Sequence, residues 1–273
     1  MILSIDLGGT NIRIAQVENG RCTNKASVPC RAGEDAATVI GQLSGLIRGA
    51  MTPQVTGIGI GVPSIVSADG IVYNVANIAS WREVHLKELL EEEFGIPVAV
   101  GNDADCFALG ENLYGSGRSY ADMVGITIGT GIGAGVIVNH RLYGGEYDGA
   151  GEVGSLPYRD SDFEHYCSSI FFKRFDTTGA ALARRAQHGD AGALDIWRQL
   201  GHHIGQLMKA ILFAYSPKAI IIGGGISQSY PLFQESMLNA MDDFPYPLIA
   251  KGVRIGVSEL EDASLLGASA LLN

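Results

Sequence analysis

Residues 2–15 read ILSIDLGGTNIRIA, and a similar arrangement returns in residues 123–137, which read MVGITIGTGIGAGVI. Each stretch has a short apolar run, a turn of glycine and threonine, and a second apolar run. That pattern predicts two strands joined by a tight loop. A glycine-rich turn offers backbone N–H groups to an anion, with no Cβ to keep the anion away. Two such loops facing each other could hold one polyphosphate from both sides.

A second pair of segments indicates an internal duplication. Residues 55–63 (VTGIGIGVP) and 218–226 (KAIIIGGGI) both read as buried strands that end in glycine, each downstream of a hairpin in its own half. The repeat is too long for a solenoid. We therefore predict an α/β fold with two related domains and a cleft between them. The first domain covers residues 1–104 and is joined by a C-terminal helix over 262–273, and the second covers 105–261.

Composition excludes several classes of protein. Of the 273 residues, 47% are hydrophobic and 18% charged, which is typical of an ordered globular chain. A net charge of −10 argues against a nucleic-acid surface, which needs a basic stripe. No apolar run is long enough to span a bilayer, and no signal peptide follows Met1. Four cysteines without paired spacing predict a reduced, cytoplasmic chain.

Hydrophobic periodicity gives a coarse order of elements. Strands are predicted at 2–7, 12–17, 22–28, 55–61, 98–100, 123–128, 133–138, 140–143, 219–223 and 253–257. Helices are predicted at 34–50, 81–94, 163–174, 190–214, 231–241 and 263–272, with one more beginning after Asp103.

Asp6 ends the first predicted strand, directly before Gly8-Gly9-Thr10-Asn11. A carboxylate there would face a Mg²⁺ ion on the phosphates, because hard cations take oxygen ligands. The alternative is an aspartate that caps its own turn. The second glycine loop favours the phosphate interpretation.

The other two glycine clusters are weaker signals. Gly129-Thr130-Gly131-Ile132-Gly133 is no dinucleotide fingerprint, because strand residues follow it where that fingerprint has a helix. Its alternative is a plain hairpin. Gly223-Gly224-Gly225 would let adenine or ribose lie against backbone, but taken alone it favours a simple strand-to-helix turn.

Four polar residues are candidates for chemistry on a sugar. Asn102-Asp103 follows a strand and opens a helix, so Asp103 is either a helix cap or a general base that takes a proton from a hydroxyl. Glu152 and Glu164 could accept hydrogen bonds from paired hydroxyls, although surface glutamates are usually only solvated.

These motifs together resemble the ROK family (repressors, open reading frames, kinases) of sugar kinases, in the superfold shared with actin and chaperone ATPases. The resemblance covers nearly the whole chain. The motifs that carry it are Asp6-Leu7-Gly8-Gly9-Thr10-Asn11, Gly57–Pro63, Asn77–Trp81, Gly101-Asn102-Asp103-Ala104, Ala108-Leu109-Gly110-Glu111, Gly129–Gly133, Gly149–Gly154, Glu164–Ser168, Gly223-Gly224-Gly225 and Leu265-Leu266-Gly267-Ala268.

The resemblance implies an actin-like (RNase H-like) fold, a homodimer and a role for each motif. Asp103 would be the base acting on a hexose 6-hydroxyl, and Asp6 would face Mg²⁺. The residues implied on the sugar side are Gly61, Asn77, Asn102, Asp103, Glu152, Ser155 and Glu164. Those implied on the ATP side are Asp6, Gly8, Gly9, Thr10, Asn11, Gly129, Thr130, Gly131, Gly223, Gly224 and Gly225.

The chain departs from the family pattern at three places. Ser155 stands where the family usually has a histidine that contacts both sugar and a structural zinc, and the cysteine cluster before Glu164 is missing. We therefore predict no zinc site. Ser64 replaces a usual glycine on the sugar side. Both serines bear on which sugar is selected.

The resulting prediction is a transferase, an ATP- and Mg²⁺-dependent hexose kinase that makes a 6-phosphate, with glucose the first substrate and N-acetylmannosamine the alternative. The partner is a small-molecule sugar, with no nucleic acid and no membrane. A sugar-responsive regulator of the same family is a rival, but its winged helix would precede the first phosphate motif, which here begins at Ile2. A filament-forming or chaperone ATPase would be larger.

Overall fold

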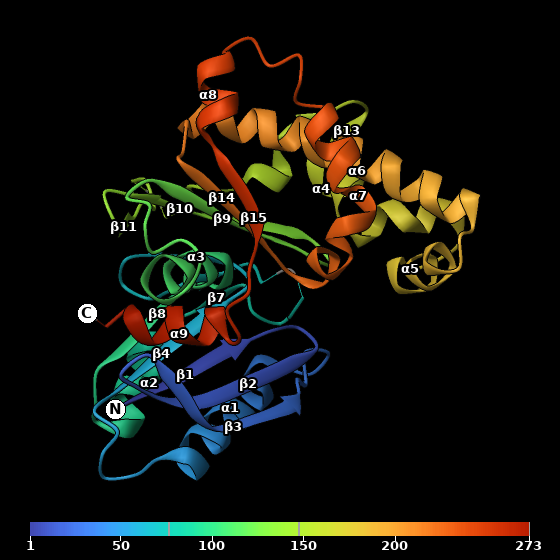
Figure 1. The fold of residues 1–273 in the computed structure, drawn as a ribbon. Helices are drawn as coiled ribbons and strands as arrows, with labels where there is room; N and C mark the ends of the chain where they lie inside the picture. The colour runs from blue at the N-terminus through green and yellow to red at the C-terminus, as the bar shows by residue number, and fades with distance from the viewer. Residues whose placement is uncertain (76, 147, 273) are drawn as a thin grey trace. The chain divides into compact units, whose positions relative to one another are not determined.

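The computed structural model describes residues 1–75, 77–146 and 148–272. Its contacts group into two compact units. Unit 1 contains Met1–Ala121, Gly135–Ala150 and Glu259–Asn273, and unit 2 contains Asp122–Ala134 and Gly151–Ser258. The predicted α/β class is confirmed by the mixed helices and sheets (Figure 1). The predicted domain limits stay a prediction, and residue 273 of the predicted terminal helix lies outside the described part.

Unit 1 is built on a five-stranded sheet of order β3-β2-β1-β4-β8. Strands β1, β2 and β3 form an antiparallel meander, whereas β1, β4 and β8 run parallel. The sheet strands are β1 (Ile2–Leu7), β2 (Asn11–Glu18), β3 (Arg21–Pro29), β4 (Gly57–Val62) and β8 (Val98–Asn102). The short strands β5 (Ile65–Val66), β6 (Val72–Tyr73) and β7 (Glu83–Val84) make a second small sheet. The helices are α1 (Ala36–Ala50), α2 (Leu86–Phe94), α3 (Asp103–Tyr114) and α9 (Ala263–Ala270).

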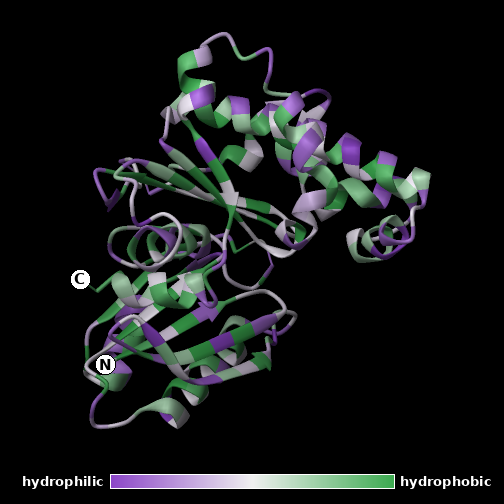
Figure 2. Cartoon of the chain, viewed as in Figure 1, coloured by the Kyte–Doolittle hydropathy of each residue, from purple (hydrophilic) through white to green (hydrophobic). Residues whose placement is uncertain are grey.

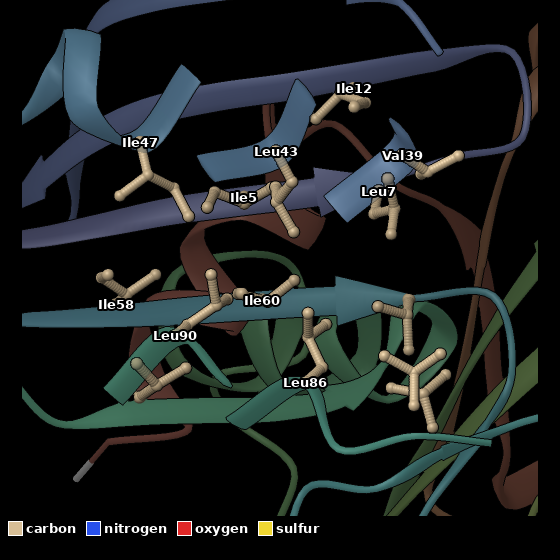
Figure 3. Close-up of a cluster of buried hydrophobic side chains, with 14 of the residues drawn as sticks. Ile5, Leu7, Ile12, Val39, Leu43, Ile47, Ile58, Ile60, Leu86 and Leu90 are labelled. Carbon is tan, nitrogen blue, oxygen red and sulfur yellow. The ribbon is translucent and has the colours of Figure 1, made fainter. Parts of the chain in front are cut away.

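The two faces of β4 are covered by different helices, and the sequence GIGIGV explains how. Side chains alternate along a strand, so Ile58 and Ile60 share one face. Both are fully buried in the core with Leu43 of α1 and Leu90 of α2 (Figure 3). Gly59 points to the opposite face, where a Cβ would lie 2.0 Å from the backbone oxygen of Ala268 in α9. Only a residue without a Cβ allows α9 to pack this closely.

The second five-stranded sheet has the order β11-β10-β9-β14-β15, and β14 runs parallel to both β9 and β15. Its strands are β9 (Met123–Ile128), β10 (Ile132–Val138), β11 (Arg141–Leu142), β14 (Ala219–Gly223) and β15 (Arg254–Val257). Strands β9, β14 and β15 belong to unit 2. That unit also contains the hairpin β12 (Pro157–Tyr158) and β13 (Ser161–Asp162), the helices α4 (Phe163–Cys167), α5 (Gly179–Gln187), α6 (Ala191–Tyr215), α7 (Tyr230–Asn239) and α8 (Pro247–Gly252), and the 3₁₀ turns η1 (Val153–Ser155), η2 (Ser169–Phe175) and η3 (Gly225–Ser229).

Helix α6 is the longest of the described helices, and its amphipathic pattern sets its orientation. Figure 2 shows apolar and polar residues alternating around it. Trp197, Leu200, Ile204 and Leu207 are buried on its inner side, at the spacing that the sequence predicted. No described helix combines the length and the apolar character needed to cross a membrane.

Two predicted helices need correction, and two helices were not predicted. The helix expected over 81–94 begins only at Leu86, because Glu83 and Val84 pair with β6 as strand β7. The helix expected over 163–174 ends at Cys167, and the Ser168 hydroxyl then caps the 3₁₀ turn η2 by accepting from the Ile170 amide at 3.2 Å. Helices α5 and α8 were not predicted at all.

Candidate active site

In unit 1 the carboxyl ends of three parallel strands meet at one edge. The register places Asp6 of β1 beside Gly61 of β4, and Gly61 beside Gly101 of β8. Asn102 follows as the partner of Val62. Ligands of α/β sheets bind outside the carboxyl ends of parallel strands. Asp6, Gly61 and Asn102 are all predicted site residues. The structure places them together at this edge, where a ligand could bind.

Asn102 is the cap of helix α3. Its Oδ1 accepts from the amides of Ala104 at 2.8 Å and Asp105 at 3.2 Å, and its Nδ2 donates to the Ser64 backbone oxygen at 3.1 Å. Asp103 is the first residue of the helix, so it does not make these capping bonds. The reading of Asp103 as merely the helix cap is therefore wrong.

Asp6 is paired with a cation that the sequence analysis missed. The Nε of Arg13 donates to Oδ2 of Asp6 at 2.9 Å, and the two residues face each other in the β1–β2 register. Arg13 also lies 3.8 Å from Asp262, which binds Lys25 at 2.8 Å. The signal in the sequence was the hairpin itself, because residues equally far from a tight turn become cross-strand neighbours.

The first glycine loop is tightly turned, and Asn77 lies against it. The Gly8 amide donates to the Asn11 backbone oxygen at 2.9 Å. A Cβ on Gly9 would lie 2.3 Å from the Cβ of Asn77, so these two predicted site residues are neighbours. The side chains of Thr10 and Asn11 are exposed.

Cys106 lies near several negative charges at this edge of the sheet. It is fully buried, and a Cβ on Gly61 would lie 3.2 Å from its Sγ. Burial holds the pKa of the Cys106 thiol well above its usual value, and the negative charges of Asp105, Asp103 and Asp6 add to the shift. Asp6 and Asp103 are thus close enough to act on the same group.

In unit 2 the second glycine loop is bound by a carboxylate. Glu164, on helix α4, accepts a hydrogen bond from the Ile132 amide at 2.9 Å through Oε2. A Cβ on Gly131 would lie 2.5 Å from that same oxygen. The Gly129 amide donates to the Gly131 backbone oxygen at 2.9 Å, which closes the turn, and Thr130 is exposed at its tip. Two predicted groups, the loop and Glu164, therefore meet.

Glu152 lies near enough to Glu164 for the two charges to interact. Glu152 as a whole is exposed, but the protein around its carboxylate removes solvent, and this raises the pKa of Glu152; the charge of Glu164 raises it further. Ser155 is also exposed, and its amide donates to the Glu152 backbone oxygen at 3.2 Å. Glu152, Ser155 and Glu164 thus form one polar group.

The third glycine cluster lies beside the second loop. Gly223 pairs with Thr127 at the ends of β14 and β9. Gly224 has φ of +82°, and a Cβ there would lie 2.4 Å from the Ile128 backbone oxygen, so only glycine suits the turn. A Cβ on Gly225 would meet no atom within 4 Å.

Metal-binding side chains do not cluster in the part of the chain that the structure describes. Among residues 1–75, 77–146 and 148–272, no group of three or more His, Cys, Asp or Glu residues could hold a metal ion. The predicted absence of zinc stays a prediction, which metal analysis of the purified protein would test.

The chain is similar to known proteins over nearly its whole length. The pattern of the ROK family matches residues 2–170 and 163–273. A glucokinase from Halalkalibacterium halodurans is 27% identical over 99% of this chain and 94% of its own length. The xylose repressor of Bacillus subtilis is 28% identical over 79% of this chain, but that covers only 60% of the repressor.

Among solved structures, a ROK family glucokinase from Streptomyces griseus in complex with glucose and AMPPNP is similar over 99% of this chain and 98% of that one. The TM-score is 0.84 at 26% identity. The predicted actin-like fold is confirmed by this likeness.

Proposed function

Since the chain belongs to the ROK family, we propose that it is a kinase that transfers the γ-phosphoryl group of ATP to the 6-hydroxyl of a hexose. The support comes from relatives that match over nearly the whole of both chains, among them the glucokinase of H. halodurans and the glucose-bound glucokinase of S. griseus. Glucose is the first substrate to test, and N-acetylmannosamine is the alternative that the sequence left open.

The observation that carries the proposal is that Asn102, and not Asp103, caps helix α3. Asn102 caps helix α3, so the carboxylate of Asp103 is not required for capping. Asp103 directly follows Asn102, the last residue of β8, and its charge and that of Asp6 both act on Cys106. There it would accept the proton of the sugar hydroxyl as that oxygen attacks the γ-phosphorus and ADP leaves.

Asp6 fits the Mg²⁺ that accompanies ATP. Its carboxylate is the hard oxygen ligand that Mg²⁺ prefers, and because both hydrogen bonds from Arg13 go to Oδ2, Oδ1 could face the ion. When bound, Mg²⁺ would draw negative charge from the phosphate oxygens. The backbone amides of the loops at Gly8–Asn11 and Gly129–Gly131 would hold phosphate oxygens, and the open face of Gly225 would receive the adenosine.

Glu152 and Glu164 would accept hydrogen bonds from sugar hydroxyls. Glu164 uses Oε2 for the Ile132 amide, and a carboxylate has further lone pairs for a ligand. Asn77, Asn102 and Ser155 would supply neutral polar contacts. On the same family expectation the enzyme is cytoplasmic and a homodimer, and sedimentation of the purified protein measures the second point.

A coupled ADP-release assay tests the proposal with glucose, mannose, fructose, allose, N-acetylglucosamine and N-acetylmannosamine. Asp103→Asn should lower kcat about 10²–10⁴-fold, the usual contribution of a general base, while both ligands still bind. Asp35→Asn is the matched control, since Asp35 does cap a helix, accepting from the Thr38 amide at 2.8 Å. Asparagine caps about as well as aspartate, so this control should keep full activity. An Asp103→Asn enzyme within a few-fold of wild type refutes the catalytic assignment.

A sugar-responsive regulator is the second candidate, favoured by the similarity to the xylose repressor. It predicts that sugar binds while no ADP is released with any sugar in the panel. Titration calorimetry beside the kinetic assay separates the two functions.

A further inference from the structure

Helix α4, which carries Glu164, is too short to hold its own position. It spans five residues, Phe163–Cys167, and is capped by Asp162, whose carboxylate accepts from the His165 amide at 2.9 Å. Helices shorter than about 12–15 residues are marginal in water without tertiary contacts. Whatever orients Glu164 must therefore come from packing around the helix.

That packing is an aromatic cluster that includes a partly buried hydrogen bond. The ring of Tyr158, in strand β12, stacks on Phe163 with centroids 4.4 Å apart and an angle of 11°. Its hydroxyl oxygen lies 3.1 Å from Nδ1 of His203, on helix α6. His203 is only 8% exposed. Tyr158 thus connects the residue before Glu164 to the longest described helix of unit 2.

The other side of α4 is held as well. The ring of Tyr166 packs edge-on against Tyr158 at 5.2 Å and against His203 at 4.9 Å, and its hydroxyl donates to Asp160. The guanidinium of Arg174 lies 3.9 Å above the Tyr166 ring, within cation–π range. The cluster therefore contacts α4 at both of its buried aromatic residues.

The carboxylates need such support because they repel each other. Glu152 and Glu164 are neighbouring like charges, and no lysine or arginine bridges them in the described ion pairs. In the described part of the chain, the Ile132 amide is the group that holds the Glu164 carboxylate in place. A small rotation of α4 would break that bond, since hydrogen bonds weaken steeply with distance and angle.

We propose that Tyr158 and His203 are positioning residues whose hydrogen bond, with the Tyr158–Phe163 stack, fixes α4 so that Glu164 stays on the Ile132 amide. The proposal rests on the proposed function only for its consequence, that sugar use depends on this bond. Neither Tyr158 nor His203 is proposed to touch the substrate. Both act through Glu164.

Both partners of the bond are neutral at neutral pH. Burial, with the nearby positive charges of Arg159, His202 and Arg174, lowers the pKa of His203 to about 4, and burial raises the pKa of Tyr158. The hydrogen bond is therefore one between neutral groups, and a neutral partner can replace the imidazole.

The test of positioning is amide hydrogen exchange at Ile132, followed by NMR in the full chain. Tyr158→Phe should speed exchange at Ile132 roughly two- to tenfold, the effect of one neutral hydrogen bond, with unchanged exchange in β14. His203→Leu should match it. His203→Asn, whose amide can meet the Tyr158 hydroxyl, should restore protection. Tyr246→Phe is the matched control, because Tyr246 is 55% exposed in the same unit. Unchanged Ile132 exchange in both Tyr158→Phe and His203→Leu overturns the proposal.

Kinetics then test the consequence separately. Tyr158→Phe should raise the KM for sugar roughly two- to tenfold and leave the KM for ATP unchanged. In a Glu164→Gln background the same change should add nothing, because Tyr158 acts only through Glu164. Additive effects on sugar kcat/KM contradict that route. If exchange at Ile132 responds but sugar kinetics do not, the positioning holds and the role of Glu164 in the proposed function fails.

Discussion

Strands β4 and β14 occupy equivalent places in the two five-stranded sheets but bury their faces differently. Each runs parallel to the strand that leads into a glycine loop, β1 or β9. Aligning Gly8 with Gly129 makes Gly59 of β4 equivalent to Ile221 of β14, since they pair with Ser4 and Gly125. Gly59 receives helix α9 at close range, whereas Ile221 fills its face with a side chain.

The difference shows what the glycines of β4 do. The motif around Gly61 predicts a sugar-side residue at that position. The structure adds a packing reason for glycine in this strand: the Ser4 hydroxyl donates to the Leu265 backbone oxygen, and α9 lies directly on Gly59, while Gly61 faces Cys106 of α3. A glycine-alternating strand therefore indicates a helix packed at backbone distance as readily as a ligand site.

The largest effect on this comparison should come from Gly59→Ala. The new methyl group would lie 2.0 Å from the Ala268 backbone oxygen, so α9 must shift. We expect a loss of about 3 kcal/mol in the free energy of unfolding, the upper end for overpacking, measured by urea denaturation. Gly225→Ala is the matched control, because nothing lies within 4 Å of its Cβ position, and its stability should stay near that of wild type. Equal stabilities of the two variants would contradict the packing role of Gly59.

The two glycine loops differ in where their negative charge comes from. The same alignment makes Asp6 equivalent to Thr127, and each pairs with the last glycine of its neighbouring strand, Gly61 or Gly223. The first loop has its carboxylate on the strand, balanced by Arg13. The second loop has a hydroxyl at that place, and its carboxylate arrives from α4. A carboxylate at a strand end beside a glycine loop can serve as an oxygen ligand of a metal, and a carboxylate that accepts from an amide can also accept from hydroxyl groups.

Asp6→Asn and Thr127→Val sharpen this contrast. Removing the charge at Asp6 should lower kcat/KM for MgATP roughly ten- to a hundredfold, the usual effect of losing a group that supports a bound metal. Thr127→Val should cost about threefold or less, because the Thr127 hydroxyl makes only a 3.4 Å bond to the Gly133 backbone oxygen. The assay is a Mg²⁺ titration at saturating sugar. Comparable losses for both variants would mean that the loops share one role.

The sequence predicted the strand framework well because buried strands have a strong local signature. The runs around Ile5, Ile60, Ile126 and Ile221 are apolar and bounded by glycine, and each is a strand in the structure. The helix predicted to start at Trp81 begins later because Val84 pairs with Val72 of β6, and this pairing is not visible in the local pattern of residues 81–94. Local periodicity cannot detect pairing of two-residue strands.

In the candidate site, too, only the residues with a local signal in the sequence could be predicted. Motifs gave Asp6, Asn102 and Glu164 because they adjoin glycine turns or strand ends. Their partners stayed hidden: the bond between Glu164 and Ile132 joins residues 32 positions apart, and that between Asn102 and Ser64 joins residues 38 positions apart. Tyr158 and His203 gave no motif signal, since their roles arise only when β12 and α6 meet. Which residue supports a functional group is decided by tertiary packing.

The smallest expected change in stability concerns the paired acids of the second loop. Because the pKa of Glu152 is raised in the folded protein, the folded state binds a proton more tightly than the unfolded state, and stability falls as pH rises through that range. Glu152→Gln removes this penalty. It should raise the melting temperature slightly at pH 7, and the gain should vanish below the ordinary pKa of a glutamate. Sugar kcat/KM should nevertheless fall roughly ten- to a hundredfold, the cost of losing one charge-assisted hydrogen bond. Calorimetric melting at pH 4 and pH 7, with kinetics at pH 7, measures both effects. A variant that melts lower than wild type at pH 7 would show that Glu152 stabilises the fold, and the proposed repulsion between the two acids would then be wrong.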